Sequence, residues 1–460
     1  MKRKIQAILV GLLSLCVAFV FVGCGEKTQD FDATKVAVGS ATFTYNGTAQ
    51  VFTVSYPDVE TTVKYSLDNE TFVTADQLAT VNAGSYKVYY KLSAEGYNDY
   101  LGNLDMTIAK ADATVTVNDA YQLKDGTKAN ITSTVTGVLG NDDLGITYTI
   151  VNLPTSGLVA GATYDITAST TNANYNVTVV NGKCTVVDNV AIKHGNTVTF
   201  ASSLQEAYDK AENDDILVLY ADAVLSAKLN VEKTFTIDGQ GRFTVSAGEE
   251  MSESRDGNLV LVDSATPVTL TLRNVTLDAK QKCRTIYVGT KNTLVIDGAT
   301  ITGGMLGSTV RFASGLYVSG GAKLVMTSGN ITGNRMRTDN LDPSQLVDGK
   351  LKYEARESQD LWIGANAVAE ISGGNIGIMF INSNEYAKTN PGHVDLNGGS
   401  VESLYVDYGG DEEKGEFFGA ILNYNGGTIG TLKISTTNSN GEYVEKTAVA
   451  GTTYKGGETA

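Results

Sequence analysis

Short runs of alternating apolar and polar residues recur along the chain between Val36 and Val187. Clear examples are residues 42–45, 63–67 and 86–90. Turn-forming residues such as Asn46-Gly47 interrupt these runs. Alternation with a period of two predicts half-buried strands, and many short strands at this spacing predict a β-sandwich.

The same region repeats itself. Residues 82–111 are echoed by residues 159–187, with an Ala-Gly-x-Tyr type motif, a strand, a Tyr-Asn turn and a closing apolar strand in each. A period of roughly 75 residues predicts two tandem sandwich domains, at 36–110 and 111–189. With "YNGTAQ" at 45–50 and "TIAKA" at 107–111, the first copy resembles the MBG-type Ig-like repeats of bacterial surface proteins. That resemblance implies a role as spacers.

The pattern changes after residue 190. Residues 202–211 have helical spacing, with Leu204, Ala207, Tyr208 and Ala211 on one face. Ser202 or Ser203 is expected to cap this helix, and Glu206 to complete a capping box. A short helix ahead of strands at 216–220, 229–231 and 234–239 resembles the N-terminal cap of right-handed parallel β-helices.

Two short elements then alternate to the end of the chain. The first is an apolar strand, an Asn/Gly turn and a second short strand, found at 270–277, 294–301, 324–331, 369–376, 394–401 and 422–429. The second is a four-residue strand, found at 260–263, 286–289, 316–319, 361–364, 379–382, 404–407 and 432–435. A period of roughly 24–30 residues predicts one coil of a parallel β-helix per repeat. The expected fold is therefore all-β, with two Ig-like sandwiches followed by a right-handed, pectate-lyase-like β-helix over 190–460.

The four-residue strands place an unusual set of side chains on one outer face. Their first and third residues are apolar and are expected to point inward, so the second residue points out. In successive coils this residue is Leu261, Tyr287, Tyr317, Trp362, Phe380, Tyr405 and Lys433. The aromatic members would stack about 4.8 Å apart. An exposed stripe of this kind indicates a binding surface, and flat rings suit the apolar faces of sugars.

Two alternatives for this stripe stay open. Its rings are exposed and bind a ligand, or insertions at 335–358, 383–391 and 408–418 fold over it, with Phe417 and Phe418 as covers. The candidate ligand-binding residues are the five aromatic ones, Tyr287, Tyr317, Trp362, Phe380 and Tyr405.

The N-terminus carries an export signal. Lys2, Arg3 and Lys4 precede an apolar run over 5–22, and Gly23-Cys24 follows. The pattern predicts a signal peptide at 1–23 and a polar tether at 24–35. A cysteine after a small residue resembles the lipobox of bacterial lipoproteins, which implies cleavage before Cys24, lipidation of its thiol and membrane anchoring outside the cell. An uncleaved membrane anchor is the alternative.

Composition limits the chemistry. The formal net charge of −16 argues against nucleic acid as a partner. Only His194 and His393 are present, so a histidine-based metal site or catalytic triad is not expected. Aligned coils bring no carboxylate cluster together, and Asp263 and Asp407 lie far apart. We expect no catalytic residues, no metal and no cofactor.

The sequence therefore favours a surface-anchored binding or adhesion protein with a glycan or another cell-surface ligand. A polysaccharide lyase or glycoside hydrolase on the β-helix, and a purely structural surface protein, are the alternatives. The same solenoid fold serves all three functions.

Overall fold

The computed structural model describes residues 29–78, 82–251, 257–306, 314–336, 346–347, 350–351, 359–383, 390–411, 416–436 and 443–457. Strands account for nearly all of the regular structure in these ranges, and α1 (Leu204–Lys210) is the one α-helix. The prediction of an all-β fold is confirmed. The predicted signal peptide, the start of the predicted tether and Cys24 lie outside the described residues.

Backbone contacts divide the chain into two compact units. The first contains the described residues of 29–118, 133–149 and 167–181, and the second contains those of 119–132, 150–166 and 182–457. The domain boundaries at 110 and 189 stay predictions.

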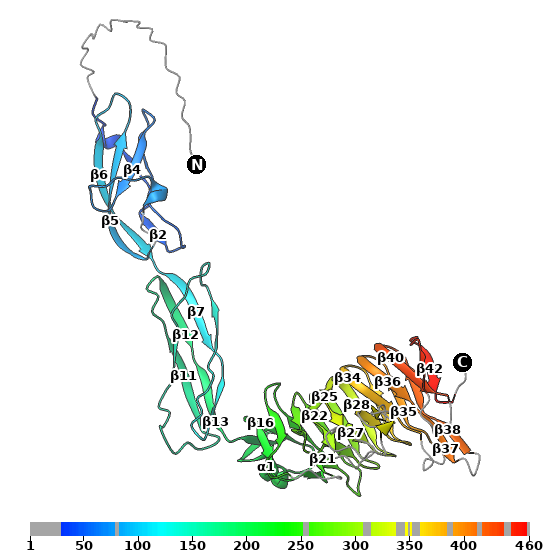
Figure 1. The fold of residues 1–460 in the computed structure, drawn as a ribbon. Coiled ribbons are helices and arrows are strands. Elements are labelled where there is room, and N and C mark those ends of the chain that lie inside the picture. Colours follow the sequence, from blue (N-terminus) through cyan, green and yellow to red (C-terminus); the bar gives the residue numbers. More distant parts are fainter. Residues whose placement is uncertain are drawn as a thin grey trace, which may run out of the picture. The chain divides into compact units, whose positions relative to one another are not determined.

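The first unit contains small sheets built from the alternating segments (Figure 1). One sheet has the order β2 (Thr42–Thr44), β6 (Tyr100–Ala109), β5 (Gly84–Ser93) and β4 (Thr62–Ser66), in which β2 runs parallel to β6 and the other neighbours are antiparallel. β1 (Ala37–Val38) pairs with β3 (Val54–Ser55). A second sheet has β12 (Tyr175–Val180) parallel to β7 (Ala111–Val117), which is antiparallel to β9 (Ser133–Thr136). Phe52, Val88, Leu92, Met106 and Ile108 form the buried apolar centre around the first sheet.

A further sheet has the order β10 (Thr147–Ile150), β11 (Thr163–Ser169), β13 (Gly182–Val187) and β8 (Ala120–Leu123). β8 and β13 belong to the second unit and run parallel to each other. Cys184, on β13, is fully buried.

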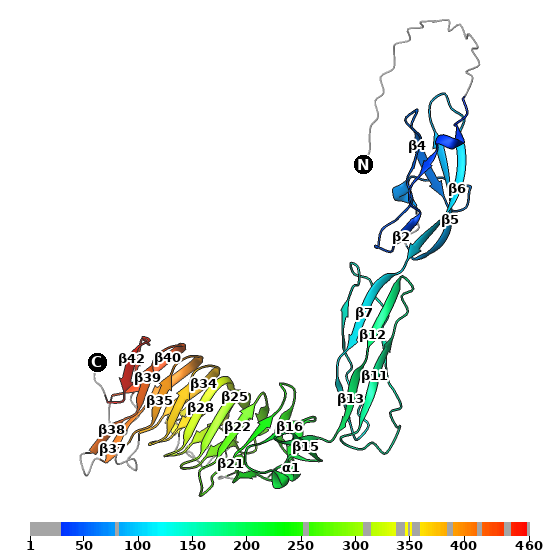
Figure 2. The same cartoon turned by 180° about the vertical axis from the view of Figure 1, so that it is seen from behind.

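Most of the rest of the second unit is one sheet, of 23 strands among the described residues, that winds into a solenoid; we call this solenoid the coil and one circuit of it a turn. Its strands lie in three parallel stacks, and each strand pairs with the corresponding strand of the next turn (Figures 1 and 2). The first stack consists of β18 (Leu229–Val231), β21 (Asn258–Val262), β24 (Arg284–Val288), β27 (Ser314–Val318), β32 (Gln359–Ile363), β34 (Asn375–Ile381), β36 (Ser400–Val406) and β40 (Thr428–Ser435).

The other two stacks complete each turn. The second consists of β16 (Asp215–Leu219), β19 (Phe235–Asp238), β22 (Thr269–Arg273), β25 (Thr293–Thr302), β28 (Lys323–Ile331), β33 (Val368–Ile371), β35 (His393–Leu396) and β39 (Ile421–Tyr424). The third begins with β17 (Ala223–Leu225), β20 (Thr244–Ala247) and β23 (Thr276–Asp278) and continues through the ends of β25 and β28 and the starts of β34, β36 and β40.

Antiparallel strands close both ends of the coil. β14 (Val190–His194) pairs with β15 (Thr197–Ala201) and with β16. At the other end β41 (Tyr443–Lys446) pairs with β40, and β42 (Thr452–Lys455) pairs with β39. These strands occupy backbone hydrogen-bonding groups that would otherwise form open sheet edges.

Helix α1 forms as the sequence predicts. The Ser203 hydroxyl accepts a hydrogen bond from the backbone N–H of Glu206, and the Glu206 carboxylate accepts one from the backbone N–H of Ser202 at 2.9 Å. Leu204, Ala207 and Tyr208 are buried in the core of the coil. The helix therefore covers apolar residues of the first turn.

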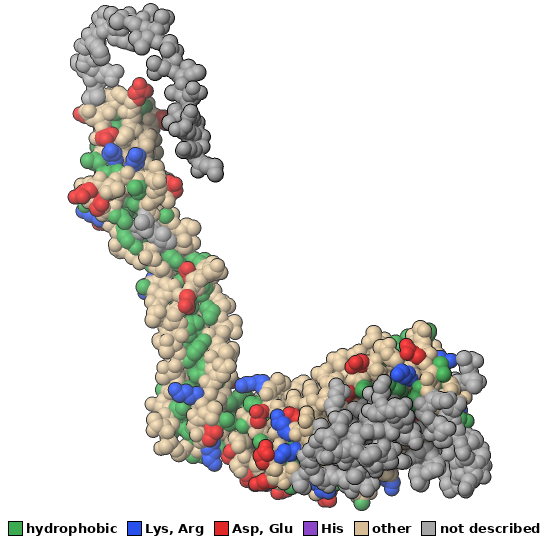
Figure 3. Space-filling model, viewed as in Figure 1, with side chains coloured by type: hydrophobic (Ala, Val, Ile, Leu, Met, Phe, Trp, Pro, Cys, Tyr) green, Lys and Arg blue, Asp and Glu red, His purple; other side chains and the backbone are tan. Residues whose placement is uncertain are grey.

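Inward side chains of the three stacks form one continuous apolar core. On the outside, ion pairs such as Lys323–Glu370 (2.8 Å) connect successive turns. Acidic and basic side chains are interspersed on the face that Figure 3 shows. Three short strand pairs stand apart from the coil sheet: β26 (Met305–Leu306) with β29 (Arg335–Met336), β30 (Leu346–Val347) with β31 (Lys350–Leu351), and β37 (Tyr408–Asp411) with β38 (Glu416–Gly419).

Candidate functional site: an aromatic column on the coil

The first stack brings the five candidate residues together. Strand register places Tyr287, Tyr317, Trp362, Phe380 and Tyr405 directly opposite one another in successive turns. We call this set the aromatic column. Leu261 precedes it and Lys433 follows it in the same register. The flanking residues of each strand, such as Ile286 and Val288, are fully buried in the core, so the aromatic residues between them lie on the outer face.

The rings of the column are stacked. Ring centroids are 5.4 Å apart for Tyr287 and Tyr317, 6.0 Å for Tyr317 and Trp362, 4.5 Å for Trp362 and Phe380, and 6.4 Å for Phe380 and Tyr405. The planes of the first two pairs differ by only 5° and 6°. Parallel strands one turn apart hold equivalent side chains in this offset arrangement, which aromatic rings favour.

Exposure differs between the middle of the column and the rest. Trp362 is 1% exposed and Phe380 is 0% exposed, although both lie outside the apolar core cluster. Tyr287, Tyr317 and Tyr405 are half-buried. A column exposed along its whole length, one of the two alternatives from the sequence, therefore does not describe Trp362 and Phe380. Most of the insertions considered as covers lie outside the described residues, and so does the side chain of Phe417.

Cationic side chains lie against both ends of the column. The Arg284 guanidinium is 5.0 Å from the Tyr317 ring centroid and 5.7 Å from that of Tyr287, and it donates to the Asn258 side chain at 3.2 Å. At the other end the Lys433 ammonium lies 5.3 Å from the Tyr405 ring centroid. Such contacts stabilise a cation over the negative face of a ring.

Arg284 is a residue that sequence reasoning missed. Strict alternation assigns it to the inward face with Ile286 and Val288, yet it contacts rings on the outer face. Tyr443 was also missed. It stands on the antiparallel closing strand β41, and its ring meets Tyr405 edge to face at 5.4 Å.

The phenol of Tyr317 has a shifted acidity. Burial raises the pKa of Tyr317 above its ordinary value, as does the neighbouring Tyr287, whereas the Arg284 charge and a hydrogen bond with Trp362 act in the opposite direction. Tyr317 therefore stays a neutral hydrogen-bonding group at physiological pH.

Buried polar side chains form hydrogen bonds with the backbone of the strands that carry the column. The Asp360 carboxylate accepts hydrogen bonds from the backbone N–H groups of Asn334 and Ile378, both at 2.9 Å. The Asn334 side chain in turn accepts from the Gly304 N–H at 2.8 Å. Since such groups are costly to bury without partners, these bonds fix the positions of β32 and β34.

The groups that could take part in chemistry near the column are few among the described residues. Among them, no group of three or more His, Cys, Asp or Glu side chains is arranged to hold a metal ion. His194 contacts Asp215, and His393 contacts Asp395, in different turns of the coil. The column offers aromatic surfaces, a guanidinium and an ammonium, all of which can contact a ligand.

Comparison of the chain with family models, with curated proteins and with solved structures found no match. Within the described part of the chain, no helix has the length and apolar character needed to cross a membrane.

Proposed function

We propose that this chain is a lipid-anchored protein of the bacterial cell surface that binds glycans through the tyrosines of its aromatic column. The observation that carries the proposal is the combination of stacked, half-buried tyrosine rings with a cation at each end. Amphipathic rings present a flat apolar face to a sugar and a hydroxyl to its polar groups.

Within this proposal the members of the column have different roles. Tyr287, Tyr317 and Tyr405 contact the ligand, since each retains exposed surface. Trp362 and Phe380 are buried and hold the tyrosines in register. Because the contacting rings are already held in place, their side chains lose less conformational entropy when a ligand binds.

The architecture that fits this role is two Ig-like spacers at 36–110 and 111–189, followed by a right-handed parallel β-helix over 190–460. Three parallel stacks with one set of strands per turn support the β-helix. Each of the two segments contains a parallel pair formed by an early and a late strand, β2 with β6 and β7 with β12, which supports a repeated spacer.

Surface attachment rests on the sequence around Cys24. The positive residues, the apolar run and Gly23-Cys24 support cleavage and lipidation. Mass spectrometry of the native protein should detect an acylated N-terminus at Cys24. An N-terminus elsewhere, or an unmodified Cys24, would show that the chain is not anchored by a lipid on Cys24.

A glycan-array screen of the purified soluble chain from residue 25, followed by calorimetry with the glycans that bind, tests the binding function. Tyr405→Ala should weaken binding by about 2 kcal/mol, since aromatic contacts dominate interface energies. Tyr287→Ala should have a similar effect. Neither change should unfold the coil, because both side chains lie outside the core cluster and, unlike Trp362, are only half-buried.

Tyr164→Ala is the matched control, since Tyr164 is a half-buried tyrosine on β11, away from the column. It should leave glycan affinity unchanged. If no glycan binds, or if the column variants bind as well as the control, the glycan-binding function is wrong and a structural role takes its place.

A further inference from the structure

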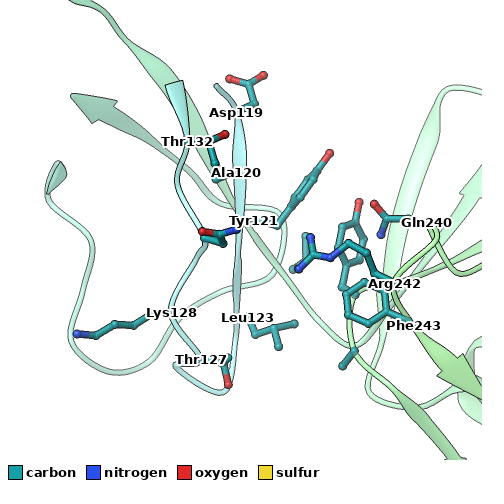
Figure 4. Close-up of a pocket in the computed structure, with 14 residues that line it drawn as sticks. Asp119, Ala120, Tyr121, Leu123, Thr127, Lys128, Thr132, Gln240, Arg242 and Phe243 are labelled. Carbon is teal, nitrogen blue, oxygen red and sulfur yellow. The ribbon is translucent and has the colours of Figure 1, made fainter. Parts of the chain in front are cut away.

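A second candidate site lies in the second unit, away from the aromatic column. A cavity of about 460 Å³ is lined by residues of β8 and the loop that follows it and by residues of the first turns of the coil (Figure 4). Small-molecule sites are commonly of 300–1,000 Å³. The cavity is therefore large enough for one or two sugar rings.

Aromatic side chains form part of its wall. Tyr121, from β8, and Tyr220, which follows β16, have ring centroids 4.7 Å apart and planes inclined at 53°. Tyr121 is 49% exposed, so its ring retains a face that a ligand can cover. Phe243, from the segment between β19 and β20, adds apolar surface and packs against the core of the coil.

Arg242 places a positive charge at the cavity. Its guanidinium lies 5.3 Å from the Phe243 ring centroid, and in Figure 4 the side chain extends from the coil toward β8. Lys128 extends away from Arg242 in the same view. Asp119 accepts a hydrogen bond from the backbone N–H of Lys183 at 2.7 Å. Arg242 is exposed, and within the described parts of the chain no carboxylate forms an ion pair with it, so its fork of donors can receive a ligand anion.

Gln240 provides a fixed amide next to this cation. Its backbone has a positive φ of 56°, and its side-chain NH₂ donates to the carbonyl of Leu219. Because the NH₂ group is held by the backbone and Gln240 lines the cavity, its amide oxygen can serve as an acceptor for a ligand hydroxyl.

We infer that this cavity binds a carboxylated sugar such as a uronic acid. The Tyr121 and Tyr220 rings lie against the sugar, the Arg242 guanidinium pairs with its carboxylate, and the Gln240 amide oxygen accepts from a hydroxyl. With a net charge of −16 the chain as a whole repels anions, so the affinity depends on Arg242. The inference concerns a site separate from the aromatic column and does not rest on the proposed function.

Calorimetry on the soluble chain from residue 25 tests the inference, with trigalacturonate as the probe and neutral galactotriose as its uncharged counterpart. Arg242→Gln should lower the affinity for trigalacturonate by about tenfold or more, since a charge-assisted pair is lost. Tyr121→Ala should lower the affinity for both saccharides. Circular dichroism checks that each variant stays folded.

Arg273→Gln is the matched control, because Arg273 is another arginine of the coil and pairs at the surface with Asp297. It should bind trigalacturonate like the unmodified chain. The inference is overturned if trigalacturonate shows no saturable binding up to roughly 10 mM, if galactotriose binds equally well, or if Arg242→Gln and Arg273→Gln behave alike. Tyr405→Ala should leave this binding unchanged, so a failure here leaves the glycan-binding function of the column to its own test.

Discussion

Trp362 shows how a residue on the outer face of a sheet can contribute to stability. It stacks on Phe380 at 4.5 Å, contacts Tyr317 on its other side, and is almost fully buried. The rings above and below it belong to the neighbouring turns of the coil. Trp362 therefore connects three successive turns outside the apolar core.

Trp362→Ala should accordingly lower the free energy of unfolding by about 3–5 kcal/mol, the usual cost of removing a large buried aromatic side chain. Denaturant unfolding measures the change. Val224→Ala is the control, because Val224 is a coil residue that is 66% exposed, and it should change stability by no more than about 0.5 kcal/mol. A similarly small change for Trp362→Ala would mean that its neighbours do not enclose it.

His194 is a second residue whose surroundings give it a measurable property. Its Nδ1 lies 2.6 Å from a carboxylate oxygen of the buried Asp215, and its Nε2 lies 3.9 Å from Glu212. The hydrogen bond with Asp215, then the charges of Asp215 and Glu212, raise the pKa of His194 above 6.5. The protonated imidazole is thus favoured in the folded chain.

An NMR titration should find the pKa of His194 above 6.5, and Asp215→Asn should bring it back toward that value. His393→Gln identifies the signal, since the chain has only two histidines. Because the folded pKa is raised, the contribution of the pair to stability is fully present below pH 6.5 and is lost as the pH rises through the folded pKa. A His194 titration at or below 6.5, or one unaffected by Asp215→Asn, would contradict this assignment.

At the scale of elements, glycines set the turn between the second and third stacks. Gly329, Gly374, Gly399 and Gly427 all have positive φ, between 83° and 112°. A Cβ on Gly399 would lie 2.5 Å from the carbonyl oxygen of Gly374 in the preceding turn, and one on Gly427 would lie 2.5 Å from that of Gly399. These positions require glycine both for their backbone conformation and for the close approach of neighbouring turns.

Gly399→Ala should therefore lower the free energy of unfolding by more than backbone strain alone would. Gly451→Ala is the matched control, because Gly451 also has a positive φ, of 82°, but no atom lies within 4 Å of its added Cβ. The control should lose about 1–2 kcal/mol of stability from the left-handed conformation. Gly399→Ala should lose a further 1 kcal/mol or so, typical of overpacking. Equal losses in chemical denaturation would show that the turns are not in close contact.

Much of this element structure can be predicted from the sequence. The repeated strand and Asn/Gly turn define the stacks. Equivalent positions of the repeats form the same column as the strand register does, from Leu261 to Lys433. Helix α1 follows from its capping residues. The closing strands β41 and β42 could not be predicted, because they lie outside the repeat and pair antiparallel to it.

Burial of the column was harder to predict. Alternation decides on which face of a strand Trp362 lies, but not what lies against that face, because burial depends on contacts between segments distant in sequence. The contact of Arg284 with the rings was missed because its side chain departs from the alternation at the start of β24.

At the scale of the whole molecule, the account depends on a coil that is closed at both ends and carries an ordered column on its outer face. Antiparallel strands pair with strands at both ends. Among the described residues Cys184 and Cys283 are free and buried, so they form no disulfide. The column adds a second line of contacts between turns. The central claim is that Trp362 and Phe380, in the middle of the column, are buried, whereas the three tyrosines of the column are half-buried.

Fluorescence of the full chain tests that claim most directly, because Trp362 is the single tryptophan. Stacked between Tyr317 and Phe380 and 1% exposed, it should emit at shorter wavelength than free indole in water and be protected from quenching by iodide. Emission near that of free indole, with ready quenching by iodide, would place Trp362 in water and contradict the account.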